Sequence, residues 1–210
     1  MEAAEHAGGE ETGSVSSRVF LLSPAHCGGK RAALLLSEHA TFDLAGRLRS
    51  PSGVTLGEVF SFVSGLYFRG KLAYAMRFAR APQGVAGAQV ITTNRGLLPP
   101  ETPVGLLDLA EFGTVDIRAD DPRYRAPVDR DLARLAMEPH LEVVLLGSVA
   151  TGKYVDVLLE ALGDRLVFPI EFLGRGDMSR GALLLRAVRE ERELEYAPVV
   201  SIARRMTSVP

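Results

Sequence analysis

Residues 141–162 read LEVVLLGSVATGKYVDVLLEAL, and this stretch decides the fold. The apolar run over 141–146 predicts a buried strand, and the apolar spacing over 150–162 predicts an amphipathic helix. The turn between them is rich in small residues, so its backbone N–H groups can gather at a helix start, where anions bind. A strand joined to a helix by such a turn indicates an α/β protein with a ligand site beside the turn.

Three further segments repeat the order of a buried strand, a polar turn and a helix. Their expected strands cover residues 18–23, 88–93 and 165–168. Strands that alternate with helices predict a parallel sheet covered on both faces. We therefore expect a three-layer α/β/α fold with a central, mostly parallel four-stranded sheet, and the segment 195–210 is a candidate for an added edge strand.

The composition bounds the number of domains and the surroundings of the chain. The 210 residues, 47% of them hydrophobic, are enough for one sizeable core. We expect residues 1–16, which are rich in Ala, Gly and Glu, to form a disordered tail, and residues 17–210 to form a single α/β domain. The lone Cys27, the lack of a long apolar segment and the lack of a signal sequence predict a cytoplasmic protein without membrane partners.

The charge balance argues against a strongly basic nucleic-acid binder. The net charge is −2, and 24 basic residues stand against 26 acidic ones. Proteins that bind DNA without regard to sequence usually carry a large basic excess.

Polar side chains gather in the turns that follow the four expected strands. The carboxyl ends of parallel strands share one edge of a sheet, so residues far apart in sequence are expected to meet there. Asp177 and His26 are the expected catalytic residues, because carboxylate and imidazole are common acids and bases. The expected substrate- or phosphate-binding residues are Ser23, Asn94, Arg95, Gly147, Ser148, Lys153, Tyr154, Arg175, Ser179 and Arg180.

Several of these residues also have an ordinary structural interpretation. Asn94 precedes a glycine and suits a left-handed turn, and Ser148 can cap the helix that follows. Arg95 at the sheet edge suits bidentate binding of phosphate. Lys153 opposes the helix dipole in the first turn, which favours a bound anion there.

The spacing of a phosphate-binding loop, Gly-x-x-x-x-Gly-Lys, occurs twice. It fits residues 147–153 and 65–71, but Tyr154 and Leu72 follow where a Ser or Thr should hold magnesium. The second match lies within residues 56–80, which are expected to be helical with a break near Gly65. A solvated helix face is the ordinary interpretation of the basic residues there, namely Arg69, Lys71 and Arg77. A phosphate-loop enzyme is thus only an alternative.

Four short segments also carry a family resemblance. They are FLLSPA at 20–25, LYFRGKLAY at 66–74, VITTNRGLLP at 90–99 and VVLLGSVA at 143–150. Together they resemble the uracil-DNA-glycosylase-like superfamily, especially its prokaryotic branch of YaaA-like and modified-base-associated proteins. The resemblance covers roughly residues 18–190 and implies that fold, with a pocket suited to a base or nucleotide.

The chain departs from that family at two places. Active glycosylases of this fold carry an Asp or Asn in the first exit loop, where this chain offers Ser23 and His26. They also carry His-Pro-Ser after the fourth strand, where this chain reads GRGDMSRG at 174–181. We expect a protein that binds a nucleobase, nucleotide, modified nucleoside or nucleic acid, with cleavage of an N-glycosidic bond as the first reaction to test.

A non-enzymatic nucleotide- or nucleic-acid-binding module with a degenerate active site is the alternative. No metal or cofactor is expected in either case. The carboxylates of Asp116, Asp120 and Asp121 lack the spacing of metal ligands, and we expect them on a surface loop.

Overall fold

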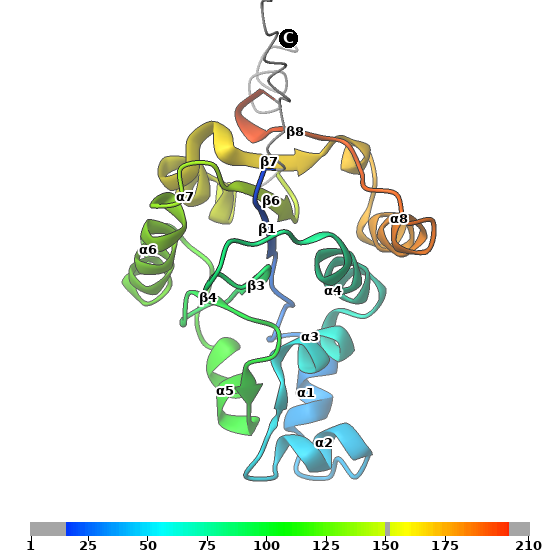
Figure 1. The fold of residues 1–210 in the computed structure, drawn as a ribbon. Helices are drawn as coiled ribbons and strands as arrows, with labels where there is room; N and C mark the ends of the chain where they lie inside the picture. The colour runs from blue at the N-terminus through cyan, green and yellow to red at the C-terminus, as the bar shows by residue number, and fades with distance from the viewer. Residues whose placement is uncertain (1–15, 150–151, 202–210) are drawn as a thin grey trace, which may run out of the picture.

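A six-stranded sheet lies at the centre of the computed structural model, which describes residues 16–149 and 152–201 (Figure 1). Its strand order is β4-β3-β1-β6-β7-β8. The strands are β1 (Arg18–Leu22), β3 (Ala88–Ile91), β4 (Leu97–Leu98), β6 (Glu142–Leu146), β7 (Leu166–Pro169) and β8 (Tyr196–Pro198). β1, β3, β6 and β7 are parallel to one another, whereas β4 and β8 pair antiparallel at the two edges.

The predicted α/β class is confirmed, and the prediction of four strands is wrong in number. The four expected strands form the parallel centre of the sheet. Two short strands extend it, because Gly96 turns the chain back onto β3 with a φ of 76° and because the segment after residue 195 pairs with β7. The strict alternation of strand and helix ends at both edges of the sheet, where the added strands are only two and three residues long.

The central strands form where the sequence predicts them because they are buried on both faces. Every residue of β1 is buried, as are the last four of β6. Phe20 in the middle of β1 stands between Ala88 of β3 and Val144 of β6. Continuous apolar runs are typical of parallel strands covered on both sides.

The helices cover the two faces of the sheet and form a further group at one end (Figure 1). They are α1 (Lys30–Leu36), α2 (Asp43–Leu48), α3 (Leu56–Ser64), α4 (Leu66–Phe78), α5 (Leu106–Phe112), α6 (Pro122–Ala136), α7 (Gly152–Leu162) and α8 (Asp177–Arg189). In Figure 1, α4 and α8 lie on one side of the sheet, and α6 and α7 lie on the other. A small antiparallel sheet, β2 (Val54–Thr55) with β5 (Pro103–Val104), accompanies α1, α2, α3 and α5.

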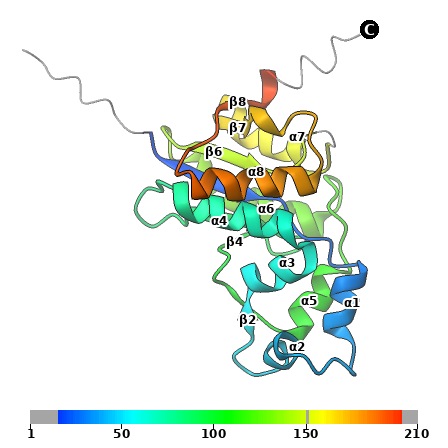
Figure 2. The ribbon, with the colours of Figure 1, turned by 90° about the vertical axis from the view of Figure 1, so that its right-hand side faces the viewer.

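The long helical segment breaks where the sequence predicts. α3 ends at Ser64 and α4 begins at Leu66, and Gly65 between them has a φ of 69°. Only glycine adopts this left-handed conformation readily. The break allows α4 to change direction and run beside α8 (Figure 2).

Two glycines allow α4 and α8 to pack backbone against backbone. A Cβ atom added at Gly70 would lie 2.7 Å from the carbonyl oxygen of Gly181. A Cβ atom added at Gly181 would lie 2.9 Å from the carbonyl oxygen of Leu66. Side chains larger than hydrogen are therefore excluded from this crossing, and the face of α4 that carries Tyr67, Lys71 and Tyr74 is buried.

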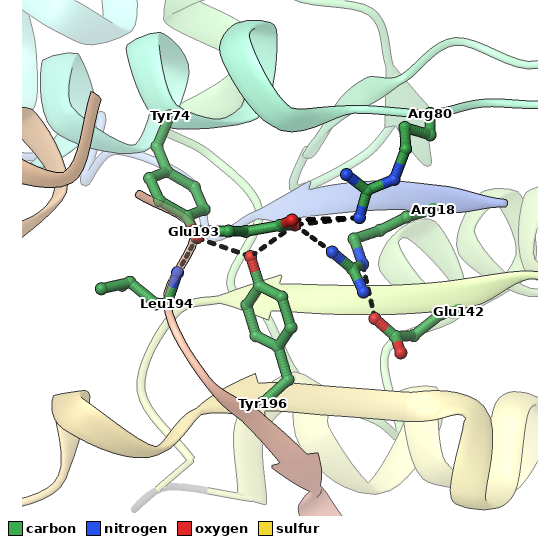
Figure 3. Close-up of polar contacts among 7 residues, drawn as sticks. All are labelled: Arg18, Tyr74, Arg80, Glu142, Glu193, Leu194 and Tyr196. Carbon is green, nitrogen blue, oxygen red and sulfur yellow. Dashed lines mark hydrogen bonds and ion pairs between the residues drawn. The ribbon is translucent and has the colours of Figure 1, made fainter. Parts of the chain in front are cut away.

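An ion-pair network ties the C-terminal segment to the amino ends of the central strands (Figure 3). Arg18, at the start of β1, donates a hydrogen bond of 2.5 Å to Glu142, at the start of β6, and also pairs with Glu193. Arg80 pairs with the same Glu193 carboxylate at 3.0 Å. The Arg18 side chain is only 11% exposed, so its charge depends on these two carboxylates.

Two tyrosines extend this network. The Tyr74 and Tyr196 hydroxyl oxygens are 2.6 Å apart, and the backbone N–H of Leu194 donates to the Tyr74 oxygen at 2.8 Å. The Tyr196 hydroxyl donates to Glu193 at 3.3 Å. These bonds fix the segment that leads into β8, which explains how a three-residue strand holds its place on the sheet.

Glu193→Gln should destabilise the protein measurably. The substitution leaves the buried Arg18 guanidinium with one carboxylate instead of two, and we expect the free energy of unfolding to fall by about 2 kcal/mol. Glu191→Gln is the control, because the Glu191 side chain is 72% exposed and pairs with Arg77 at the surface. Urea unfolding measures both variants, and equal effects would show that the network contributes no more than a surface pair.

Candidate functional site

A pocket of about 290 Å³ opens at the carboxyl ends of β1 and β3. Its wall combines the loop after β1, the residue Thr93 after β3, the segment after α5 and one side chain of α7. The lining residues are Ser23, Pro24, Ala25, His26, Cys27, Gly28, Thr93, Phe112, Gly113, Val115, Asp116, Ile117 and Tyr154. The volume is at the small end of the range for ligand pockets and suits one or two fused rings.

Three residues predicted from the strand exits line this pocket together: Ser23, His26 and Tyr154. His26 is exposed, so its imidazole is accessible to a ligand, whereas Ser23 is 9% exposed. Asp116, which we expected on a plain surface loop, also lines the pocket and is exposed to solvent. An imidazole and a carboxylate from distant parts of the chain therefore share one pocket.

In the loop after β6, the Tyr154 hydroxyl is hydrogen-bonded to the backbone of Ser148. This hydroxyl accepts a hydrogen bond from the backbone N–H of Ser148 at 3.0 Å and donates to the Ser148 carbonyl at 3.1 Å. A Cβ atom at Gly147 would lie 2.6 Å from the same hydroxyl, so glycine is required there. A phosphate at this loop would have to displace Tyr154 from the Ser148 N–H. The side chain of Lys153 lies outside the described residues.

The residues after β3 bind neighbouring protein groups. The Arg95 guanidinium pairs with Asp108 at 2.6 Å and with Glu111 at 2.7 Å, and it lies 5.4 Å from the ring centroid of Phe112. Asn94 Oδ1 is buried and accepts no hydrogen bond from any described residue. Neither residue lines the pocket, and an anion at Arg95 would have to compete with two carboxylates.

The predicted residues after β7 also contact one another and the backbone. Arg175 donates to the Glu171 carbonyl at 2.8 Å and to the Ser179 hydroxyl at 3.1 Å. Arg180 donates to the Phe172 carbonyl at 3.3 Å and lies 3.9 Å from Asp177.

The predicted catalytic carboxylate is therefore separate from the pocket. The Asp177 side chain is 73% exposed at the start of α8, and none of the described residues of its loop is among those that line the pocket. The catalytic role of Asp177 remains a prediction.

The sequence interpretation missed Lys71, which is fully buried. Its side chain lies between aromatic rings, with Nζ 4.5 Å from the Tyr67 ring centroid and 5.0 Å from that of Phe68. Nζ donates to the Ser23 carbonyl at 2.6 Å and to Ser23 Oγ at 2.9 Å. Burial lowers the pKa of Lys71 from 10.5 to about 7, and the Asp177 carboxylate opposes this shift. Lys71 therefore does not line the pocket itself, but it is hydrogen-bonded to Ser23, which does.

Helical spacing could have revealed the position of Lys71. Tyr67, Lys71, Tyr74 and Phe78 recur at intervals of three and four residues, and all four are buried. The interpretation as a solvated face is preferred only for Arg77, and it is confirmed there because Arg77 is exposed; it does not hold for Lys71, which is buried. The spacing therefore indicates which face of α4 is buried, and only the charge of Lys71 argued against placing this residue on that face.

Cys27 lies in the pocket wall but is a poor nucleophile. The thiol is buried, its Sγ atom donates to the Ala25 carbonyl at 3.6 Å, and burial raises its pKa to about 12. A thiol with a raised pKa carries little thiolate at neutral pH, and the thiolate is the reactive form. Within the described ranges, no three His, Cys, Asp or Glu side chains are grouped to hold a metal ion.

No family model, curated protein or solved structure matches the chain. The resemblance to uracil-DNA-glycosylase-like proteins therefore stays a prediction. Among the helices of residues 16–149 and 152–201, none has both the length and the apolar character needed to cross a bilayer.

Proposed function

We propose that the pocket at the carboxyl ends of β1 and β3 binds a nucleobase or nucleoside in the cytoplasm, on a three-layer fold of the uracil-DNA-glycosylase type. The observation that carries this proposal is the shared lining by His26, Asp116, Phe112 and Tyr154. A flat heteroaromatic ring needs apolar walls for its faces and hydrogen-bonding groups at its edge. The two aromatic residues contribute to such walls, and the imidazole and carboxylate supply donors and acceptors.

Cleavage of an N-glycosidic bond is the reaction that these groups fit best. Asp116 would accept a proton from the water that attacks the anomeric carbon, and the His26 imidazolium would protonate the departing base. The C–N bond breaks as the new C–O bond forms, so the products are a free base and a sugar with a hydroxyl at its anomeric carbon, which is free when a nucleoside is cleaved and stays in the strand when DNA is cleaved. In this proposal Asp116 performs the task that the sequence suggested for Asp177.

A binding module without turnover is the second candidate, and one observation favours it. The described groups expected to hold phosphate are already engaged, because Tyr154 binds the Ser148 N–H and two carboxylates bind Arg95. A ligand would then be recognised through its base alone. Regulation by a free base or nucleoside would need no catalytic step.

Isothermal titration calorimetry with a panel of free bases, 7-deazapurines and nucleosides tests the proposed function. We expect binding of at least one heteroaromatic compound, and Asp116→Asn should weaken it about tenfold through the lost charged acceptor. Asp120→Asn is the control, because Asp120 pairs with Arg118 on the adjacent surface and does not line the pocket.

Chromatography of the released base then separates the two candidates. Nucleosides and uracil-containing or modified DNA serve as substrates, and release that depends on His26 and Asp116 supports the enzyme. Binding without release supports the module. If the folded protein binds no member of the panel, or if both Asp variants lose binding equally, the proposed function is wrong.

A further inference from the structure

Ser23 and Lys71 form a pair whose chemistry the proposed function does not use. Ser23 lines the pocket, whereas Lys71 does not, and Lys71 Nζ lies 2.9 Å from Ser23 Oγ. A serine that lines a pocket, with an amine within hydrogen-bond distance of its hydroxyl, is the arrangement of a nucleophile and its base. We propose that Ser23 is a nucleophile activated by Lys71, and that it gives the pocket acyl-transfer activity toward small esters. This inference does not rest on nucleobase binding.

The fold restricts the movement of both Ser23 and Lys71. Ser23 directly follows the buried strand β1, and its backbone N–H donates to the Leu146 carbonyl of β6 at 3.2 Å. Lys71 Nζ donates to the Ser23 carbonyl at 2.6 Å as well as contacting the hydroxyl. Lys71 follows Gly70, which packs against the backbone of Gly181 on α8, and its own side chain is buried. The heavy atoms of the pair therefore need not move before proton transfer. Only the hydrogen bond from Lys71 Nζ to Ser23 Oγ must reverse, with the Ser23 hydroxyl turning its proton toward Nζ.

The surroundings of Lys71 favour the neutral amine that a base requires. Its side chain is 1% exposed and lies against the Tyr67 and Phe68 rings. With a pKa of about 7, much of Lys71 is uncharged at neutral pH. A neutral amine can still donate one N–H to the Ser23 carbonyl, and its lone pair is then available for the Ser23 hydroxyl proton.

The charged and titratable groups around the pair come from three helices. They are Tyr67 on α4 itself, Asp177 and Arg180 on α8, and Tyr154 on α7. Asp177 raises the pKa of Lys71 and so opposes burial. Between Arg18 and Ser23, β1 presents the apolar side chains of Val19 to Leu22.

The reaction balances with an ester and water as the only reactants. Ser23 Oγ attacks the carbonyl carbon while its proton moves to Lys71 Nζ. The bond from the acyl carbon to the leaving oxygen breaks, and the ammonium returns the proton to that oxygen. Water then attacks the acyl-serine with Lys71 again as the base, and the acid is released with Ser23 and Lys71 restored.

Labelling with an alkyl fluorophosphonate tests this pair in the full-length protein. The probe forms a bond from phosphorus to a serine oxygen and loses fluoride, so intact mass spectrometry and peptide mapping report the modified residue. We expect one adduct at Ser23, none in Ser23→Ala, and at least a hundredfold slower labelling in Lys71→Met. Ser52→Ala and Lys30→Met change exposed residues that do not line the pocket, and these variants should label like the wild type.

The pH profile separates an activating lysine from a structural one. Labelling and hydrolysis of p-nitrophenyl acetate should both rise with pH, with a midpoint near 7 that reports the ionisation of Lys71. If Lys71→Met does not fold, Ser23→Cys provides the second measurement, because alkylation of its thiol by iodoacetamide should follow the same midpoint rather than that of a free thiol. A folded wild type whose Ser23 stays unlabelled from pH 6 to 9, or is labelled without regard to pH, would overturn the proposal.

Discussion

Gly181→Ala should lower the free energy of unfolding by about 3 kcal/mol, although alanine is the better helix former. The new methyl group would lie 2.9 Å from the Leu66 carbonyl oxygen and 2.9 Å from Tyr67 Cα. Both are backbone atoms that cannot rotate away, so α4 and α8 must separate, and overpacking of this kind costs about 1–3 kcal/mol. The separation also loosens the aromatic packing around Lys71.

Gly46→Ala is the matched control for that substitution. Gly46 lies within α2, and apart from its chain neighbours and the backbone of its own helix no atom lies within 4 Å of the position that its Cβ would take. The same change should therefore stabilise the protein by about 0.5–1 kcal/mol through helix propensity alone. Urea unfolding and thermal melts measure both variants, and opposite signs are expected. A Gly181→Ala protein as stable as the wild type would show that the helix crossing tolerates a methyl group.

The central strands could be predicted because burial on both faces makes them continuous apolar runs. β1, β3, β6 and β7 all lie within one residue of the expected starts, and the helix break at Gly65 follows from a glycine in a helical segment. The edge strands gave a weaker signal, because β4 was not predicted and β8 was predicted only as a candidate edge strand within residues 195–210. They are two and three residues long, and their pairing depends on contacts made by distant residues such as Glu193 and Tyr74.

The place of the candidate pocket could be predicted from the sequence, and its lining residues only in part. The rule that ligands bind beyond the carboxyl ends of parallel strands correctly brought Ser23, His26 and Tyr154 to one pocket. The rule does not predict which carboxylates an arginine will pair with. Arg95 pairs with Asp108 and Glu111 of α5 and does not line the pocket.

Lys71 shows a different limit of the sequence. Lysine is almost never fully buried, so its charge argues for the surface even where the helical spacing argues for the core. The conflict is resolved in three dimensions, because the Ser23 carbonyl and hydroxyl lie within hydrogen-bond reach of the buried amine. Positions where the residue type conflicts with the surrounding pattern are expected to be functional or strained sites.

The wild-type protein should become more stable as the pH rises from about 7 to about 9, and Lys71→Met should lose this dependence. In the folded protein the pKa of Lys71 is lowered to about 7 by burial, from its ordinary 10.5 in the unfolded chain. Between these values the unfolded chain binds a proton that the folded protein has released. The free energy of unfolding therefore increases with pH. The slope starts at about 0.7 kcal/mol per pH unit at pH 7, where half of the folded protein has lost the proton, and approaches about 1.4, so the gain from pH 7 to 9 is roughly 2 kcal/mol.

Other buried groups limit this gain at higher pH, and their effect has the opposite sign. Burial raises the pKa of the Cys27 thiol to about 12, and it raises that of the Tyr74 hydroxyl to about 12 despite hydrogen bonds from Tyr196 and Leu194. The folded protein keeps these protons after the unfolded chain has lost them, so stability falls above about pH 9 for the thiol and above about pH 10 for the phenol.

Urea unfolding at pH 6 to 10 should give a maximum near pH 9 for the wild type. The difference between the wild type and Lys71→Met isolates the lysine, because both proteins share Cys27 and Tyr74. A difference that stays constant from pH 7 to 9 would mean that Lys71 keeps its ordinary pKa, and the amine could then not act as the base for Ser23 at neutral pH.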